Sequence, residues 1–157
     1  MADHAQAASI LDGPDEVRAA LGAHLGYSAW LHINQERVNQ FADATGDHQW
    51  IHTDAVRAAA GPFGAPIAHG YLTLALSNLF LPQIVEVRGF NMGVNYGTNK
   101  VRFPSPVPVG SRIRGGAEMT EVADVMGGLQ TTIVITIEVE GTAKPACVIE
   151  SISRWLF

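Results

Sequence analysis

The sequence has few charged residues for its length. Only 16% of its 157 residues are charged, whereas 47% are hydrophobic; a globular protein usually has about 25% charged residues. Disordered chains are rich in charge and poor in aliphatic residues, so this composition predicts a folded chain. The length is that of one domain. A low charged fraction at this size indicates that some surface is covered, for example by a second copy of the chain.

The sequence also has no cluster of basic residues. Its formal net charge is −5, and its ten basic residues are scattered without a run. Binding to nucleic acid requires clustered Lys and Arg that neutralise phosphates, so nucleic acid is not expected as a partner. A small anionic ligand is still compatible with this composition, because a local pair of cations is enough to bind one.

Signals for export, disulfides and membrane insertion are missing as well. Cys147 is the one cysteine, which excludes an intrachain disulfide and fits a reducing compartment. Residues 1–9 are small and polar, so we expect them to be flexible and see no secretory signal in them. The most apolar window, residues 67–84, is too interrupted by polar residues for a membrane span of about 20 apolar residues. We therefore expect a cytoplasmic protein that does not bind membranes.

The first half of the chain carries helix signals. Asp12, followed by an early proline and two acids, predicts the start of a helix that Gly26 ends. Asn34 is a good N-cap for a second helix, which Gly46 ends. We also expect a short strand over residues 28–33, a loop over residues 46–52, and a short helix capped by Thr53 or Asp54 that runs to Ala60.

The second half predicts a sheet around an apolar helix. Residues 68–81 are apolar nearly all round, so this helix should be enclosed by other structure. The runs that follow are rich in β-branched residues and joined by short Gly-containing turns, which favours antiparallel pairing. They cover residues 85–96, 100–103, 111–125, 129–140 and 144–155. The predicted class is α+β, with an antiparallel sheet of about five strands wrapped around one long central helix.

Two short segments contain candidate chemistry. Asp47 and His52 would place a carboxylate beside an imidazole, a pair suited to proton transfer near neutral pH. For such a pair alone, the more frequent explanation is that Asp47 caps a helix and His52 is a structural histidine. His69 and Gly70 open the apolar helix, where unpaired N–H groups and the helix dipole could stabilise an oxyanion. The alternative is that they only make room where a loop meets the sheet.

Other candidates are weaker. Cys147 lies in a strand-like run and fits a small core residue better than a nucleophile. The six histidines show no metal-binding spacing, so no metal is expected. No glycine-rich phosphate loop is found. Lys100 and Arg102 would share one face of a strand, either as a solvated edge or as a phosphate contact.

Read together, these segments resemble the MaoC-like dehydratase family, which includes the (R)-specific enoyl-CoA hydratases. Residues 41–52, Phe-Ala-Asp-Ala-Thr-Gly-Asp-His-Gln-Trp-Ile-His, resemble its hydratase motif, with a His five residues after the Asp. Pro-Ile-Ala-His-Gly at 66–70 resembles the entry to its central helix, and residues 101–110 resemble its Pro-Val-x-x-Gly strand segment. The pattern is most similar to the short members grouped with nodulation protein N.

The resemblance implies a single hotdog domain over residues 1–157 and a homodimer whose sheets join edge to edge. It implies an enzyme that reversibly hydrates trans-2-enoyl-CoA to (R)-3-hydroxyacyl-CoA without a cofactor. Asp47 and His52 would be catalytic, and the Gly70 N–H would hold the thioester carbonyl. Gln49 and His69 would complete the oxyanion and substrate-binding region. We also expect the CoA phosphates to meet three cations, namely Lys100, Arg102 and Lys144.

The sequence departs from the family at two positions. Gln49 and Trp50 stand where the family often has Asn-Pro. Gln49 still offers an amide, and Trp50 adds bulk near the mouth of the site, so the substrate range is open. Two alternatives follow. One is a hotdog acyl-CoA thioesterase, and the other is a non-catalytic acyl-CoA-binding subunit, which only the Gln49-Trp50 change supports.

Overall fold

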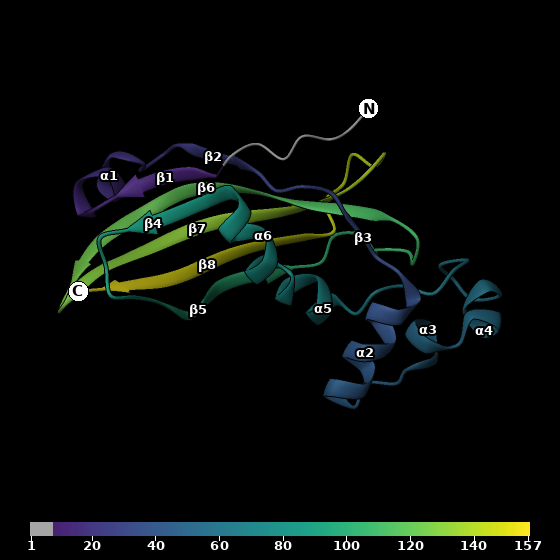
Figure 1. Ribbon diagram of the computed structural model, residues 1–157. Helices are drawn as coiled ribbons and strands as arrows, with labels where there is room; N and C mark the ends of the chain where they lie inside the picture. The colour runs from purple at the N-terminus through teal and green to yellow at the C-terminus, as the bar shows by residue number, and fades with distance from the viewer. Residues whose placement is uncertain (1–7) are drawn as a thin grey trace.

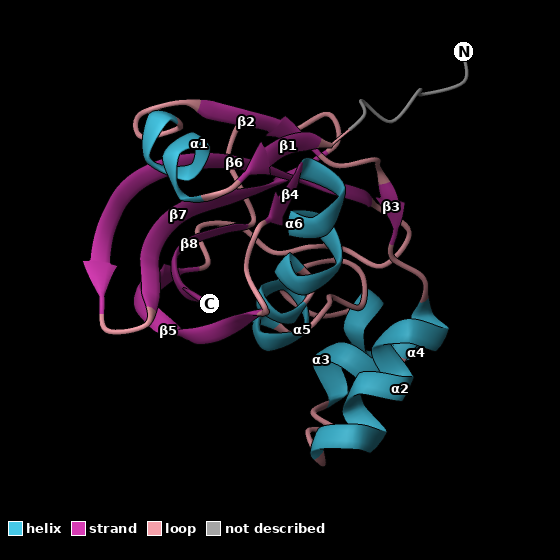
Figure 2. Cartoon of the chain, turned by 60° about the vertical axis from the view of Figure 1, so that its left-hand side comes forward, coloured by secondary structure: helices cyan, strands magenta, loops and turns pink. Residues whose placement is uncertain are grey.

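The computed structural model, described over residues 8–157, contains a curved antiparallel sheet wrapped around a helix, with three more helices gathered at one end (Figure 1; Figure 2). The main sheet has the strand order β2-β6-β7-β8-β5, and β3 pairs with β6 beyond the end of β2. Its strands are β2 (His24–Tyr27), β3 (Leu31–His32), β5 (Met92–Arg102), β6 (Arg112–Val125), β7 (Gly128–Val139) and β8 (Cys147–Leu156). This arrangement confirms the predicted α+β class and the antiparallel pairing.

The inner face of the sheet follows the predicted alternation. In β7, Ile133, Ile135 and Ile137 are almost fully buried, while the residues between them are more exposed. A period of two places alternate side chains on opposite faces, so this one strand supplies a row of isoleucines to the core. The turn between β6 and β7 contains Gly127 with φ +82°, a conformation that suits glycine.

The predicted strand over residues 85–96 is divided in the structure. Gly89, with φ +79°, separates β4 (Val85–Arg88) from β5, and β4 pairs in parallel with β1 (Ser9–Asp12) outside the main sheet. The separate strand predicted over residues 100–103 is instead the end of β5, which continues through two irregularities in its pairing with β8. The long-range β1–β4 pairing had no local signal in the sequence.

The predicted first helix is too long. Helix α1 covers only Pro14–Ala19, its N-cap is Gly13, and Asp12 belongs to β1. Gly22, with φ +80°, turns the chain, and the buried Leu25 lies in β2. Of the residues expected to be flexible, 1–7 lie outside the described part. Ser9 is paired in β1, and its hydroxyl donates to the Leu25 carbonyl over 2.9 Å.

The central helix consists of two segments, α5 (Gly70–Ala75) and α6 (Ser77–Ile84), rather than one long helix. Between them Leu76 keeps a right-handed backbone with ψ −12°, and the Leu79 N–H bonds to the Leu76 carbonyl three residues back. The expected enclosure is confirmed, because Leu72, Leu76 and Phe80 are buried. No helix among residues 8–157 is long and apolar enough to cross a membrane.

The helices at the end of the sheet are α2 (Gln35–Thr45), α3 (Trp50–Thr53) and α4 (Ala55–Ala59). As predicted, Asn34 caps α2 by accepting from the Arg37 N–H, and Gly46 ends it in the left-handed conformation. Asp54 likewise caps α4. The loop predicted over residues 46–52 is only partly correct, because residues 50–52 form most of α3. This cluster holds the predicted catalytic residues beside the N-terminus of α5 (Figure 1).

Candidate active site

Asp47 lies in the short link between α2 and α3. The left-handed Gly46 turns the chain there, and the Asp47 side chain is exposed. Its Oδ1 accepts from the Gln49 N–H over 3.3 Å, so one oxygen is partly engaged by the start of α3. Asp47 does not cap α3, because the N-cap is Gln49 and α3 has no side-chain cap hydrogen bond. The other carboxylate oxygen has no bond within the described part of the chain.

His52 lies in α3 and is buried, with 5% of its surface exposed. Its Nδ1 is 2.7 Å from the Ile67 carbonyl oxygen. A carbonyl only accepts hydrogen bonds, so Nδ1 carries the hydrogen and Nε2 presents a lone pair. Burial lowers the pKa of His52, and the neighbouring His69 lowers it further, against the Ile67 hydrogen bond and the Asp47 charge. His52 is therefore set up as a neutral hydrogen-bond acceptor at Nε2.

His69 joins these two residues. Its ring stacks on that of His52 with centroids 3.9 Å apart and planes inclined by 28°. Its Nε2 is 3.0 Å from the backbone carbonyl of Asp47 and donates to it. His69 is only 2% exposed. Its observed contacts are with the two candidate catalytic residues, and a contact with substrate stays a prediction. The structure thus brings together Asp47, His52 and His69.

The same three residues raise the question of a metal. Each offers one ligand atom, and these atoms lie within 4.8 Å of one another. However, His52 Nδ1 and His69 Nε2 are engaged by carbonyls. The two rings are stacked, so the lone pairs in their planes do not converge on one point. The arrangement fits proton transfer better than metal coordination, which needs ligands directed at a common centre.

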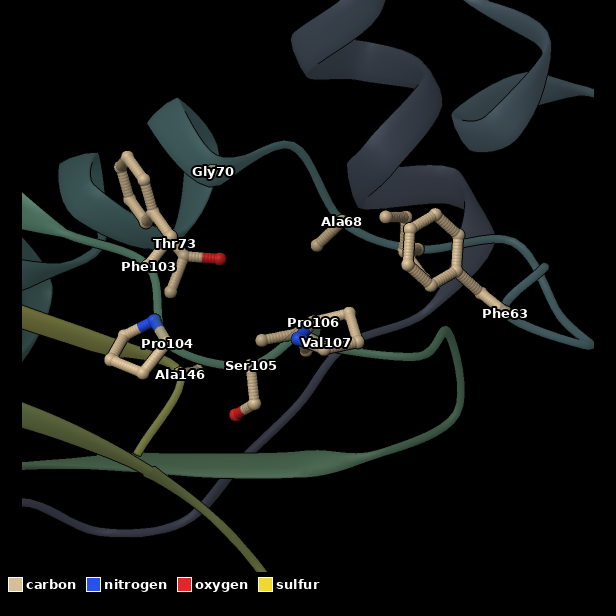
Figure 3. Close-up of a pocket in the computed structure, with 11 residues that line it drawn as sticks. Phe63, Ala68, Gly70, Thr73, Phe103, Pro104, Ser105, Pro106, Val107 and Ala146 are labelled. Atoms are coloured by element: carbon tan, nitrogen blue, oxygen red, sulfur yellow. The ribbon is translucent and has the colours of Figure 1, made fainter. Parts of the chain in front are cut away.

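A pocket of about 250 Å³ lies beside Gly70, the first residue of α5 (Figure 3). Within the described chain the Gly70 N–H donates no hydrogen bond, as expected for the first helical residue. A Cβ at this position would lie 3.3 Å from the Phe103 ring, so the absence of a side chain leaves room for a close approach. The rest of the lining is mostly apolar and consists of Phe63, Ile67, Ala68, Thr73, Pro104, Ser105, Pro106, Val107 and Ala146.

Gln49 and Trp50, the two departures from the family motif, have different surroundings. Gln49 is exposed at the start of α3, and its backbone carbonyl accepts from the His52 N–H. Trp50 packs on Gly61, where a Cβ would be 3.0 Å from the indole. The guanidinium of Arg57 lies 4.3 Å from the centre of the Trp50 ring. The bulk of Trp50 is thereby accommodated against α4 and the loop after it.

The three predicted phosphate-binding cations are exposed, and none of them lines the pocket. Arg102 immediately precedes the pocket residue Phe103, and Lys100 lies further back in β5. The hydroxyl of Ser105, another lining residue, donates to the Lys144 carbonyl over 3.1 Å. Among residues 8–157, none of these cations forms an ion pair.

Sequence reasoning missed the groups that hold the candidate catalytic pair in place. Gln35 at the start of α2 donates through Nε2 to the His52 carbonyl over 2.7 Å. Phe41 packs against His69 with ring centroids 4.9 Å apart. The carbonyl of Ile67 orients His52. Phe41 lies within the recognised motif, but Gln35 and a backbone carbonyl have no local signal that would single them out.

Comparisons with known proteins identify the family of the chain. A family model described as the MaoC like domain matches residues 16–141. The chain is 56% identical over 142 residues to 3-hydroxyacyl-thioester dehydratase Z of Mycobacterium tuberculosis, covering 90% of this chain and 94% of that one. It is 45% identical to nodulation protein N of Rhizobium meliloti, covering 83% of each. An (R)-hydratase structure from A. caviae superposes with a TM-score of 0.70 at 25% identity, covering 83% of this chain and 96% of that one.

The environments of two nearby histidines predict opposite titration shifts. We expect the pKa of His52 to lie below the ordinary value of 6.5 because of burial, and that of His48 above it because Asp43 accepts its hydrogen bond. NMR titration of the imidazole resonances measures both. Asp43→Asn is the control, and it should lower the pKa of His48 while leaving His52 unchanged. A His52 pKa at or above 6.5 would contradict the account of its environment.

Proposed function

The chain belongs to the MaoC-like dehydratase family, as its motifs predicted, and we propose on that basis that it is an (R)-specific hydratase and dehydratase of 3-hydroxyacyl thioesters. The observation that carries the proposal is the convergence of the Asp47 carboxylate with the buried, neutral His52. The dehydratase from Mycobacterium tuberculosis supports it, because the similarity extends over 90% of this chain. The enzyme class is hydro-lyase.

Proton transfer by Asp47 and His52 accounts for both directions of the reaction. During hydration, the oxygen of a water molecule bonds to the β-carbon of the enoyl thioester, and Asp47 accepts the proton that this water loses. The Nε2 lone pair of His52 accepts a hydrogen bond from the same water and orients it. A proton is then delivered through the pair to the α-carbon, so both residues end in the protonation state in which they began. Dehydration follows the same steps in reverse.

The backbone N–H of Gly70 supplies electrostatic stabilisation in this proposal. As water adds to the β-carbon, negative charge develops on the thioester oxygen. An unpaired N–H at the start of α5 is suited to bind that oxygen, and the adjoining pocket offers space for the substrate. The interaction strengthens as the charge develops, so it lowers the barrier rather than merely binding substrate. Gln49, exposed at the start of α3, is suited to a polar contact nearby.

Removal of either catalytic group should abolish most of the hydration of crotonyl-CoA. Asp47→Asn and His52→Gln should each lower kcat by about 10²–10⁴-fold, the usual contribution of a positioned acid or base. Loss of the enoyl-thioester absorbance measures the rate. Asp43→Asn and His48→Gln are matched controls, since these residues form an exposed pair 2.9 Å apart, and both variants should retain activity. Equal rates in the wild type and all four variants would mean that the catalytic residues lie elsewhere.

A thiol-reactive dye in the same assay separates the alternatives. Hydration releases no thiol, whereas a thioesterase would release free CoA. Cys147 gives little background, because burial raises its pKa to about 11. Release of CoA in step with substrate loss would favour the thioesterase, and tight binding without turnover at any chain length would favour a binding subunit.

The CoA phosphates are proposed to bind the three exposed cations near the pocket. Charge reversal at Lys100, Arg102 or Lys144 should raise the KM for crotonyl-CoA by about threefold to tenfold with little change in kcat, and the effect should weaken with salt. Steady-state kinetics at two ionic strengths measures this. Arg18→Glu is the control, because Arg18 pairs with Asp15 and Asp124 instead. A KM that charge reversal leaves unchanged would remove these residues from the binding site.

A homodimer joined edge to edge through β5 is also proposed. This strand is at the edge of the main sheet and exposes three apolar side chains, Met92, Val94 and Tyr96. An exposed edge with apolar side chains tends to pair with another strand. Size-exclusion chromatography with light scattering should give twice the chain mass of 16.8 kDa, and Val94→Lys should shift the protein toward monomer. A wild-type monomer at all concentrations would exclude this assembly.

A further inference from the structure

His69 has an unusual hydrogen-bonding state. Its Nδ1 is the one buried side-chain nitrogen or oxygen in the described part of the chain without a hydrogen-bond partner. Such atoms are rare in folded proteins because removing them from water without a partner costs free energy. A smaller or apolar residue would avoid this cost, so the presence of a histidine calls for a reason.

The other contacts of the imidazole give that reason. Its Nε2 donates to the Asp47 carbonyl over 3.0 Å, and its face stacks on His52. Phe41 packs against it, and the Thr73 hydroxyl donates to its backbone carbonyl over 3.2 Å. One rigid side chain at the start of the central helix therefore contacts both candidate catalytic residues.

Asp47 has few other restraints. Its own N–H bonds to the Thr45 hydroxyl over 3.4 Å, and its Oδ1 accepts from Gln49 over 3.3 Å. Both distances exceed the usual 2.9–3.0 Å of a good N–H···O bond. The bond from His69 is the shortest of the three, and it is the one that comes from a distant part of the chain, 22 residues away.

We propose that His69 is a positioning residue for the hydratase reaction: its N–H fixes the backbone of Asp47 while its ring fixes the plane of His52. This inference rests on the proposed function. His69 would thereby set the position of the Asp47 carboxylate relative to His52 Nε2. A displacement of about 1 Å between such groups can slow a reaction roughly 10²-fold. Phenylalanine has the ring without the donor, and glutamine has a donor of similar reach without the ring.

Two variants separate these contributions in crotonyl-CoA kinetics. His69→Phe should lower kcat by about 10–100-fold with KM changed by less than about threefold, because Asp47 loses its anchor. His69→Gln should restore kcat to within about fivefold of wild type.

The pH dependence gives a second readout. Asp47 and His69 are the titratable groups that influence the pKa of His52. In both variants the acid limb of the kcat/KM profile should move to higher pH, because a neighbour that lowers the pKa of His52 is gone.

The outcomes are distinguishable from a failure of the proposed function. Wild-type kcat in His69→Phe, or an equal loss in both variants, would overturn the positioning role. Thermal unfolding and circular dichroism show whether a loss reflects misfolding.

If the wild type hydrates no enoyl thioester, ¹⁵N NMR still tests the positioning role of His69. The His69 hydrogen should be on Nε2, and the amide signal of His48, whose nitrogen is joined to the Asp47 carbonyl, should shift more in His69→Phe than in His69→Gln. A hydrogen on Nδ1 or equal shifts would contradict it.

Discussion

The site depends on the hydrogen bond between His52 Nδ1 and the carbonyl of Ile67. This bond determines which imidazole nitrogen is left to work as an acceptor, and it does so in a buried place where the neutral ring is favoured. The carbonyl is itself held by two backbone bonds. The Ile67 N–H donates to Ile51, and the Ala68 N–H donates to Val107 over 2.8 Å. The segment before α5 therefore ties α3 to the strand-like stretch that follows β5.

The architecture provides the rigidity for this arrangement. The sheet encloses the central helix through buried residues such as Phe80, and the close approach at Gly115 leaves no space for a Cβ, which would be 2.9 Å from that of Phe80. The helix therefore has a fixed position, and with it His69 and Gly70 at its N-terminal end. The second support is α2, where Gln35 holds the backbone of His52. Hydrophobic packing thus sets positions at which a few polar bonds orient the reactive groups.

The sequence predicted the parts of this account that depend on local patterns. The caps at Asn34 and Gly46 were correct because capping is decided within a few residues. The Asp47–His52 pair became a strong prediction only through the ordered family motifs, since the spacing alone fitted a structural pair better. Three features could not be predicted from the sequence: the division at Gly89, the early end of α1 and the role of the Ile67 carbonyl. Each depends on contacts between segments distant in sequence, such as β1 with β4.

In the proposed reaction, Asp47 and His52 add water to a trans-2-enoyl thioester on one defined face. The most direct test is the configuration of the product. Crotonyl-CoA should be incubated with the wild-type protein, and the 3-hydroxybutyryl-CoA assayed with dehydrogenases specific for each enantiomer. We expect the (R) product alone, with no free CoA. An (S) product, a racemic product or release of CoA without hydration would contradict it.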